Sequence, residues 1–129
     1  TSPEGYRYIG ESEGKNKKDI NITKLRQLIE SMNADFAREE VEEKALGILF
    51  GNPQRLTSPN KRTLDFTKKC KTGAKREQIA LVKTTDLFRV TKYLTENKDE
   101  RFKKKCREAI HNGLGAIVVF PDLPKKSKK

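Results

Sequence analysis

The sequence predicts an α/β fold, in which a mixed sheet of about four strands is flanked by helices. Short apolar or β-branched runs alternate along the chain with segments whose apolar residues recur at helical spacing. Turn residues such as Gly51-Asn52-Pro53 close the apolar runs, as they do at the ends of buried strands. The 129 residues are enough for a single domain with one modest core.

The first half of the chain is expected to form a strand, a helix and a second strand. Residues 6–13 alternate loosely and are rich in aromatic and β-branched side chains, which predicts a strand. Apolar residues then recur every three or four positions over 22–32, which predicts an amphipathic helix. The acidic residues 34–44 either extend this helix or form an exposed connector. Residues 45–52 are apolar on both faces, which indicates a buried central strand.

The middle of the chain is expected to form a loop, a helix and a third strand. Pro53 begins a basic loop, and a helix is expected near 66–76. Residues 78–85 again read as a buried strand. Thr85 or Asp86 can cap the helix that follows.

The last part of the chain is expected to add a helix, a strand and a tail. Apolar residues of 102–110 share one helical face, with most of the lysines off it. Residues 115–121 predict a fourth strand. We therefore expect one α/β domain over 1–121, lacking its N-terminal part, and a basic, disordered tail over 122–129.

The charge predicts a polyanionic partner. The net charge is +11, and 36% of the residues are charged. Such a balance suits DNA, RNA or an anionic membrane face, and we expect nucleic acid. The residues 53–83 contain nine lysines and arginines against two acids, whereas 30–43 contain six acids and one arginine. The acidic segment should therefore face away from the polyanion.

The remaining composition limits the other classes of protein. No apolar run approaches the roughly 20 residues that cross a bilayer, and no secretory leader is visible. We expect a cytoplasmic protein with no membrane contact, in which Cys70 and Cys106 are reduced thiols. With His111 as the only histidine, these cysteines lack a fourth zinc ligand at a familiar spacing.

Two carboxylates near the end of the first predicted strand are candidate metal ligands. Glu11 and Glu13 would share one face of that strand, roughly 7 Å apart, because side chains at i and i+2 point the same way. Mg²⁺ prefers oxygen ligands and often takes one or two carboxylates from the protein. Lys15 could stabilise charge on a phosphate. A solvated strand end balanced by lysines explains the same residues.

The order of these segments resembles the restriction-endonuclease-like nuclease superfamily. Its signature is an aspartate followed, on the next strand, by (Asp/Glu)-x-Lys, and in several branches by a helix with a glutamine. The segment YIGESEGK at 8–15 is similar to the second strand, and TKLRQL at 23–28 looks like the helix. The strand GILFGNP at 47–53, its basic loop and the segment 79–88 are similar to the elements that follow.

The resemblance covers about residues 6–95 and implies Mg²⁺-dependent hydrolysis of DNA. It makes Glu11 a metal ligand, Glu13 a second or outer ligand, Lys15 the charge stabiliser and Gln27 a positioning residue. The outward face of an amphipathic helix is the alternative for Gln27. Two departures stand out. Glu13 occupies the place of the lysine, and Glu4 is the only acid before Glu11. Either an upstream segment or a second chain completes the site, or the site has decayed.

Basic residues beyond the second strand are candidate contacts for the nucleic-acid backbone. These are Arg55, Lys61, Arg62, Lys68 and Lys69. A solvated basic loop is the alternative for this segment. For the whole chain, the alternative is a non-catalytic nucleic-acid-binding or assembly module with the same fold. A weaker third possibility is a domain whose basic surface meets an acidic protein.

Overall fold

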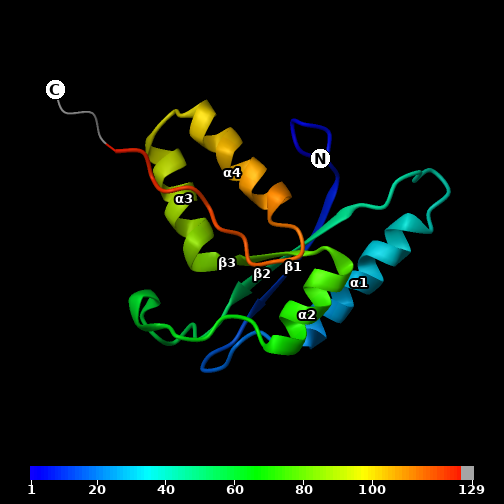
Figure 1. Cartoon of the computed structure of the whole chain (residues 1–129), viewed down its shortest axis with the longest axis horizontal. Coiled ribbons are helices and arrows are strands. Elements are labelled where there is room, and N and C mark those ends of the chain that lie inside the picture. Colours follow the sequence, from blue (N-terminus) through cyan, green and yellow to red (C-terminus); the bar gives the residue numbers. More distant parts are fainter. Residues whose placement is uncertain (126–129) are drawn as a thin grey trace.

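A three-stranded parallel sheet lies at the centre of the computed structural model, which describes residues 1–125 (Figure 1). The strands are β1 (Tyr8–Gly14), β2 (Leu46–Asn52) and β3 (Ala80–Lys83), in the order β1-β2-β3. β1 pairs with β2 over seven positions, and β2 pairs with β3 over four. The α/β class is confirmed, but the described sheet is parallel and has three strands where about four were expected.

Four α-helices cover the two faces of this sheet. They are α1 (Ile22–Phe36), α2 (Lys68–Glu77), α3 (Thr84–Glu96) and α4 (Glu100–Asn112), and a short 3-10 turn, η1, spans Pro59–Lys61. Helices α1 and α2 lie on one face, and α3 and α4 lie on the other (Figure 1). The acidic segment 34–44 was expected either to extend the first helix or to form a connector. It extends α1 only to Phe36 and forms an irregular connector beyond that residue.

Side chains next to the helices fix where three of them begin. Asn21 accepts a hydrogen bond from the Thr23 amide at the start of α1. Thr67 and Asp99 cap α2 and α4 in the same way. Such caps satisfy amide groups that have no partner inside the helix. The expected cap of α3 by Thr85 or Asp86 is wrong, because α3 starts at Thr84, directly after β3, without a side-chain cap.

Two apolar clusters hold the layers together. One lies between the sheet and α1 and α2, where Leu25, Leu28 and Leu49 are fully buried. The other lies between the sheet and α3 and α4, and includes Val82 and Val90. Burying a side chain of this size contributes about 1.5–3 kcal/mol. Each strand thus has one face in each cluster, which fixes the direction of every side chain along it.

The segment expected to form a fourth strand, residues 115–121, makes only an isolated parallel bridge to β3. Leu81 donates a backbone hydrogen bond to Ala116 at 3.0 Å and accepts one from Val118 at 2.8 Å. The ladder ends there because the chain turns into α3 at Thr84, which removes the extended partner that further pairing needs. Residues 115–121 are therefore extended beside β3 only near the bridge, and β3, with four residues, is too short to pair with all of them.

Beyond this bridge the chain runs alongside α3 (Figure 1). Leu123, Pro124 and Lys125 line a hollow with residues of α3, including Phe88 and Lys92. The other part of the expected disordered tail, residues 126–129, lies outside the described residues. Among residues 1–125 no helix has both the length and the apolar character that a bilayer crossing requires.

Candidate functional site

The two carboxylates of β1 lie on the face of the sheet that α1 and α2 cover. Ile9 packs against the cluster beneath these helices, and Glu11 and Glu13 follow it at intervals of two residues. In the ladder, Glu11 is opposite Leu49 and Glu13 is opposite Gly51. Both glutamates are partly buried, whereas Ser12 between them is exposed. The predicted shared face therefore agrees with the described strand.

Lys15 joins this group because the ladder continues past the end of β1. Its amide donates to the Asn52 carbonyl at 3.0 Å, so the backbone stays extended through Gly14. The Lys15 Nζ lies 3.2 Å from Glu13 Oε1. The side chains of Glu13 and Lys15 are 16% and 31% exposed, so the ion pair is only partly screened by water.

The second oxygen of Glu13 has an unusual environment. Glu13 Oε2 is buried and has no hydrogen-bond partner within residues 1–125. Phe66 and Ile20 lie beside Gly51, the residue opposite Glu13, because a Cβ on this glycine would come within 3.0 Å of both side chains. Buried carboxylate oxygens are normally hydrogen-bonded, so an orphaned one indicates a site that a ligand can satisfy.

Oxygen ligands at this position suit a hard divalent cation. Glu11 forms neither a hydrogen bond nor an ion pair within the described chain, so its carboxylate is available beside Glu13. The part of the chain that the structure describes contains no group of three or more His, Cys, Asp or Glu residues close enough to hold a metal. A cation at this place would therefore have at most two of these side chains as ligands, with water and substrate supplying the others.

Gln27 is not brought to these carboxylates. It is exposed, whereas Leu25 and Leu28 on either side of it are fully buried. At about 100° per residue, Gln27 lies about 160° around α1 from Leu25. Its amide consequently faces away from the sheet on which Glu11 and Glu13 lie.

The loop of residues 53–67 folds over the turn that follows β1. The amides of Gln54, Arg55 and Leu56 donate to the carbonyls of Lys18, Lys15 and Asn16 at 3.1, 2.8 and 3.2 Å. The two loops therefore form one surface at the carboxyl ends of β1 and β2, the edge at which open α/β sheets usually bind ligands.

The two arginines of this loop are engaged in holding it together. Arg62 donates to the side chain of Asn52 at 2.6 Å and to the carbonyls of Thr57 and Arg55 at 2.8 and 3.4 Å. Arg55 donates to the side chain of Asn16 at 2.6 Å. Both guanidinium groups thus have structural partners, which leaves fewer donors for a phosphate than the sequence indicated.

The three lysines predicted as backbone contacts are all exposed. Lys61 lies in η1, and Lys68 and Lys69 lie in the first turn of α2. Helix α2 carries five basic residues against one acid, Glu77, and so presents a positive surface. This helix starts next to the site, since Cys70 in its first turn is close enough to Glu13 for the glutamate charge to contribute to the Cys70 pKa.

Sequence reasoning missed the residues that shape the loop. Gln54 has a positive φ of 48°, and its side-chain oxygen accepts the amides of Thr63 and Leu64, both at 2.8 Å. Asn52 holds Arg62 from the end of β2. The Asn-Pro-Gln sequence marked a turn, but nothing local in it indicated these partners about ten residues away.

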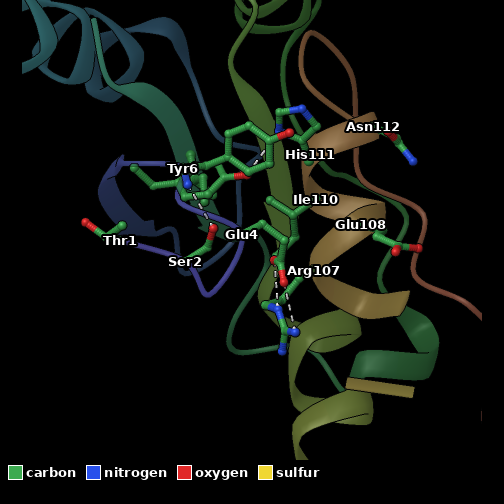
Figure 2. Close-up of a pocket in the computed structure, with 11 residues that line it drawn as sticks. Thr1, Ser2, Glu4, Tyr6, Arg107, Glu108, Ile110, His111 and Asn112 are labelled. Atoms are coloured by element: carbon green, nitrogen blue, oxygen red, sulfur yellow. Dashed lines mark hydrogen bonds and ion pairs between the residues drawn. The ribbon is translucent and has the colours of Figure 1, made fainter. Parts of the chain in front are cut away.

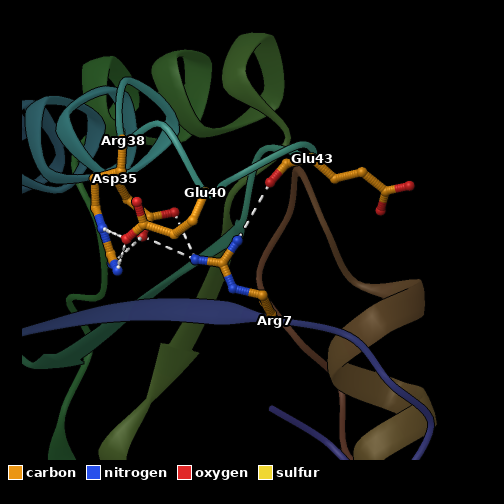
Figure 3. Close-up of polar contacts among 5 residues, drawn as sticks. All are labelled: Arg7, Asp35, Arg38, Glu40 and Glu43. Atoms are coloured by element: carbon orange, nitrogen blue, oxygen red, sulfur yellow. Dashed lines mark hydrogen bonds and ion pairs between the residues drawn. The ribbon is translucent and has the colours of Figure 1, made fainter.

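The acidic segment lies at the opposite end of β1 (Figure 3). Arg7, directly before the strand, donates to both oxygens of Asp35 at 2.8 and 2.7 Å and to the Glu43 carbonyl at 3.3 Å. Arg38 binds Asp35 and Glu40. The acids after α1 are therefore drawn to the amino end of the strand, away from the loops that contain Lys15 and Lys61.

Comparison of this chain with protein-family models, with curated proteins and with solved structures finds no match.

Proposed function

We propose that this chain acts on DNA by Mg²⁺-dependent phosphodiester hydrolysis, as a restriction-endonuclease-like domain. The observation that carries this proposal is the state of Glu13. One of its oxygens pairs with Lys15, and the other is buried without a partner on the face that also holds Glu11. A buried carboxylate oxygen without a hydrogen-bond partner lowers the stability of the folded chain. Such losses of stability are typical of functional sites.

The roles of the three side chains follow from their chemistry. Glu11 and Glu13 would hold Mg²⁺, which polarises a phosphoryl oxygen and lowers the pKa of bound water when present. Lys15 supplies a positive charge beside them that can offset the negative charge developing on the phosphate. Lys61, Lys68 and Lys69 would bind the backbone phosphates of the substrate.

A third acid would have to come from outside the described residues. The free edge of β1 supports this part of the proposal, because β1 pairs only with β2 and is the outer strand of the described sheet. An additional strand from an upstream segment or a second chain could pair there. An acid on that strand would then lie beside Glu11 and Glu13.

Nicking of supercoiled plasmid tests the hydrolytic function. The wild-type protein is expected to nick the plasmid in Mg²⁺ and not in EDTA, and Glu11→Ala and Glu13→Gln to lose at least about 100-fold in rate. Glu42→Ala is the matched control, since this glutamate is exposed in the connector. Equal nicking by all four proteins, or by none of them, contradicts the proposal.

A non-catalytic nucleic-acid-binding module is the second candidate. The ion pair between Glu13 and Lys15 favours it, because Lys15 partly neutralises the site without any metal. This candidate predicts that binding of DNA is the same in EDTA and in Mg²⁺ and weakens steeply with salt. A plasmid that stays intact while binding is strong and insensitive to the metal would select this function.

A further inference from the structure

A cavity lies on the face of the sheet that α3 and α4 cover, opposite to the face that holds Glu11 and Glu13. It has a volume of about 600 Å³, within the range of small-molecule sites. Tyr8 of β1 and Ile48 of β2 line it from the sheet. Arg107, Ile110 and His111 line it from α4 (Figure 2). The alternation along β1 puts Tyr8 on the face opposite to Glu11 and Glu13. The cavity is thus separate from the candidate hydrolytic site.

The N-terminal residues form a built wall of this cavity. Residues 2–6 close a turn in which Tyr6 and Ser2 exchange hydrogen bonds at 2.8 and 3.1 Å, with Gly5 at a φ of 91°. The turn is attached to α4 by Glu4, whose two oxygens accept from Nε and Nη2 of Arg107 at 3.0 and 3.1 Å. Arg107 holds the pKa of Glu4 below its usual value, so this pair stays charged at neutral pH.

An aromatic stack forms one end of the cavity. The Tyr6 ring lies on the His111 ring with centroids 4.0 Å apart and planes 18° apart. Tyr6 is 41% exposed, so part of its ring stays accessible beside the stack and lines the cavity. The Tyr8 hydroxyl lies 3.3 Å from His111 Nδ1, and burial raises the Tyr8 pKa, which keeps this hydroxyl protonated. His111 is therefore held in place as the support for Tyr6.

The polar groups of the cavity suit a flat ligand that both donates and accepts hydrogen bonds. Ile48 and Ile110 provide apolar surface, and the Ser2 hydroxyl and the ion pair of Glu4 with Arg107 lie beside it. Nη1 of Arg107 is not used in binding Glu4, so it remains a donor. A purely apolar ligand would bury this ion pair without compensation. Lys104 lies close enough to Glu4 for its charge to help lower the Glu4 pKa.

We propose that this cavity binds a nucleobase, with Tyr6 as the stacking platform. Every nucleobase has a flat π-face and an edge with donors and acceptors, which matches a partly exposed aromatic ring beside charged and hydroxyl groups. The base belongs either to a free nucleotide or to an unpaired nucleotide of a strand. The second source rests on the proposed nucleic-acid function, whereas the first does not.

Calorimetric titration in EDTA tests the binding of free nucleotides. AMP and CMP are expected to bind at least about tenfold more tightly than ribose 5-phosphate, which keeps the phosphate but lacks the base. Tyr6→Ala should remove this difference, and Tyr6→Phe should keep it because the ring remains. Circular dichroism checks that each variant is folded. The comparison of ligands on the wild-type protein decides the question even where Tyr6→Ala is unfolded.

A single-stranded oligonucleotide and an abasic strand of the same length distinguish the two sources. The base belongs to a strand if the strand with bases binds more tightly than the abasic strand, if this difference depends on Tyr6, and if mononucleotides do not bind. Equal affinity for base-containing and base-free ligands in both arms overturns the proposal. Glu13→Gln should leave the affinities for AMP and CMP unchanged while it affects nicking, so failure of the nucleobase site and failure of the hydrolytic site are separable.

Discussion

Lys15 Nζ lies 3.2 Å from one oxygen of Glu13, while the other oxygen of that carboxylate is buried without a hydrogen-bond partner within residues 1–125. An unsatisfied buried acceptor costs about 1–3 kcal/mol. The ion pair offsets part of that cost, since Glu13 is 16% exposed and Lys15 is 31% exposed. The pair therefore holds Glu13 in a position that is not optimal for stability.

Glu13→Met is expected to leave the protein as stable as the wild type in EDTA, or more stable by about 1 kcal/mol. The substitution removes the orphaned oxygen and leaves Lys15, which is 31% exposed, able to reach water. Millimolar Mg²⁺ should raise the urea midpoint of the wild type and not that of Glu13→Met, because a ligand stabilises only the state that binds it. Loss of several kcal/mol in EDTA would show that Glu13 has a structural role.

Lys68→Ala and Lys69→Ala are each expected to weaken DNA binding and to lower the slope of log K against log salt by about one. Both lysines are exposed at the start of α2, so neither change should affect the fold. Lys44→Ala is the matched control, because Lys44 is exposed in the acidic connector near Arg7. Fluorescence anisotropy at several salt concentrations measures the slope. An equal loss in the control would mean that binding follows net charge and not this surface.

Arg62→Ala is expected to destabilise the protein by about 2 kcal/mol, since its guanidinium bonds Asn52, Thr57 and Arg55. Limited proteolysis should then cut within residues 53–67 faster than in the wild type. The neighbouring Lys61→Ala should change stability by less than about 0.5 kcal/mol and lower DNA affinity, because Lys61 is exposed. Identical urea midpoints and cleavage rates for all three proteins would refute the structural role of Arg62.

The parts of the site that depend on local periodicity could be predicted from the sequence. Glu11 and Glu13 share a face because side chains alternate along a strand, whereas Lys15 joins them only because its amide keeps the pairing with Asn52 of β2. The helical phase of Gln27 was also available from the sequence. Its position relative to Leu25 and Leu28 already placed it on the outer face of α1.

Features that depend on distant partners could not be predicted. The sequence predicts Arg62 as a phosphate contact. In the folded loop Arg62 instead donates hydrogen bonds to Asn52 and Thr57, which the sequence alone does not place beside it. The prediction of a fourth strand was wrong because it also depends on a partner elsewhere in the fold. Residues 115–121 have the composition of a strand, but pairing requires an extended neighbour, and the chain leaves β3 for α3 at Thr84.

Cys70 makes the stability of the protein vary with pH in the alkaline range. Its side chain is fully buried, and this burial, with the nearby charge of Glu13, raises the Cys70 pKa from 9.0 to about 11. Below pH 9 the thiol is neutral in both the folded and the unfolded states. Above pH 9 the unfolded chain loses the proton first, so the free energy of unfolding falls until the folded thiol also ionises near pH 11. Over this range the free energy of unfolding falls by about 2–3 kcal/mol.

Cys70→Ala isolates this contribution. The variant is expected to be slightly less stable at neutral pH, because it lacks the buried sulfur, and to lose less stability than the wild type between pH 9 and pH 11. Both proteins keep Cys106 and all the tyrosines, so the contributions of those groups cancel in the difference between the two curves. Urea unfolding at a series of alkaline pH values gives that difference. Parallel curves would mean that the Cys70 thiol ionises equally in the folded and unfolded states, and that α2 does not shield it from water.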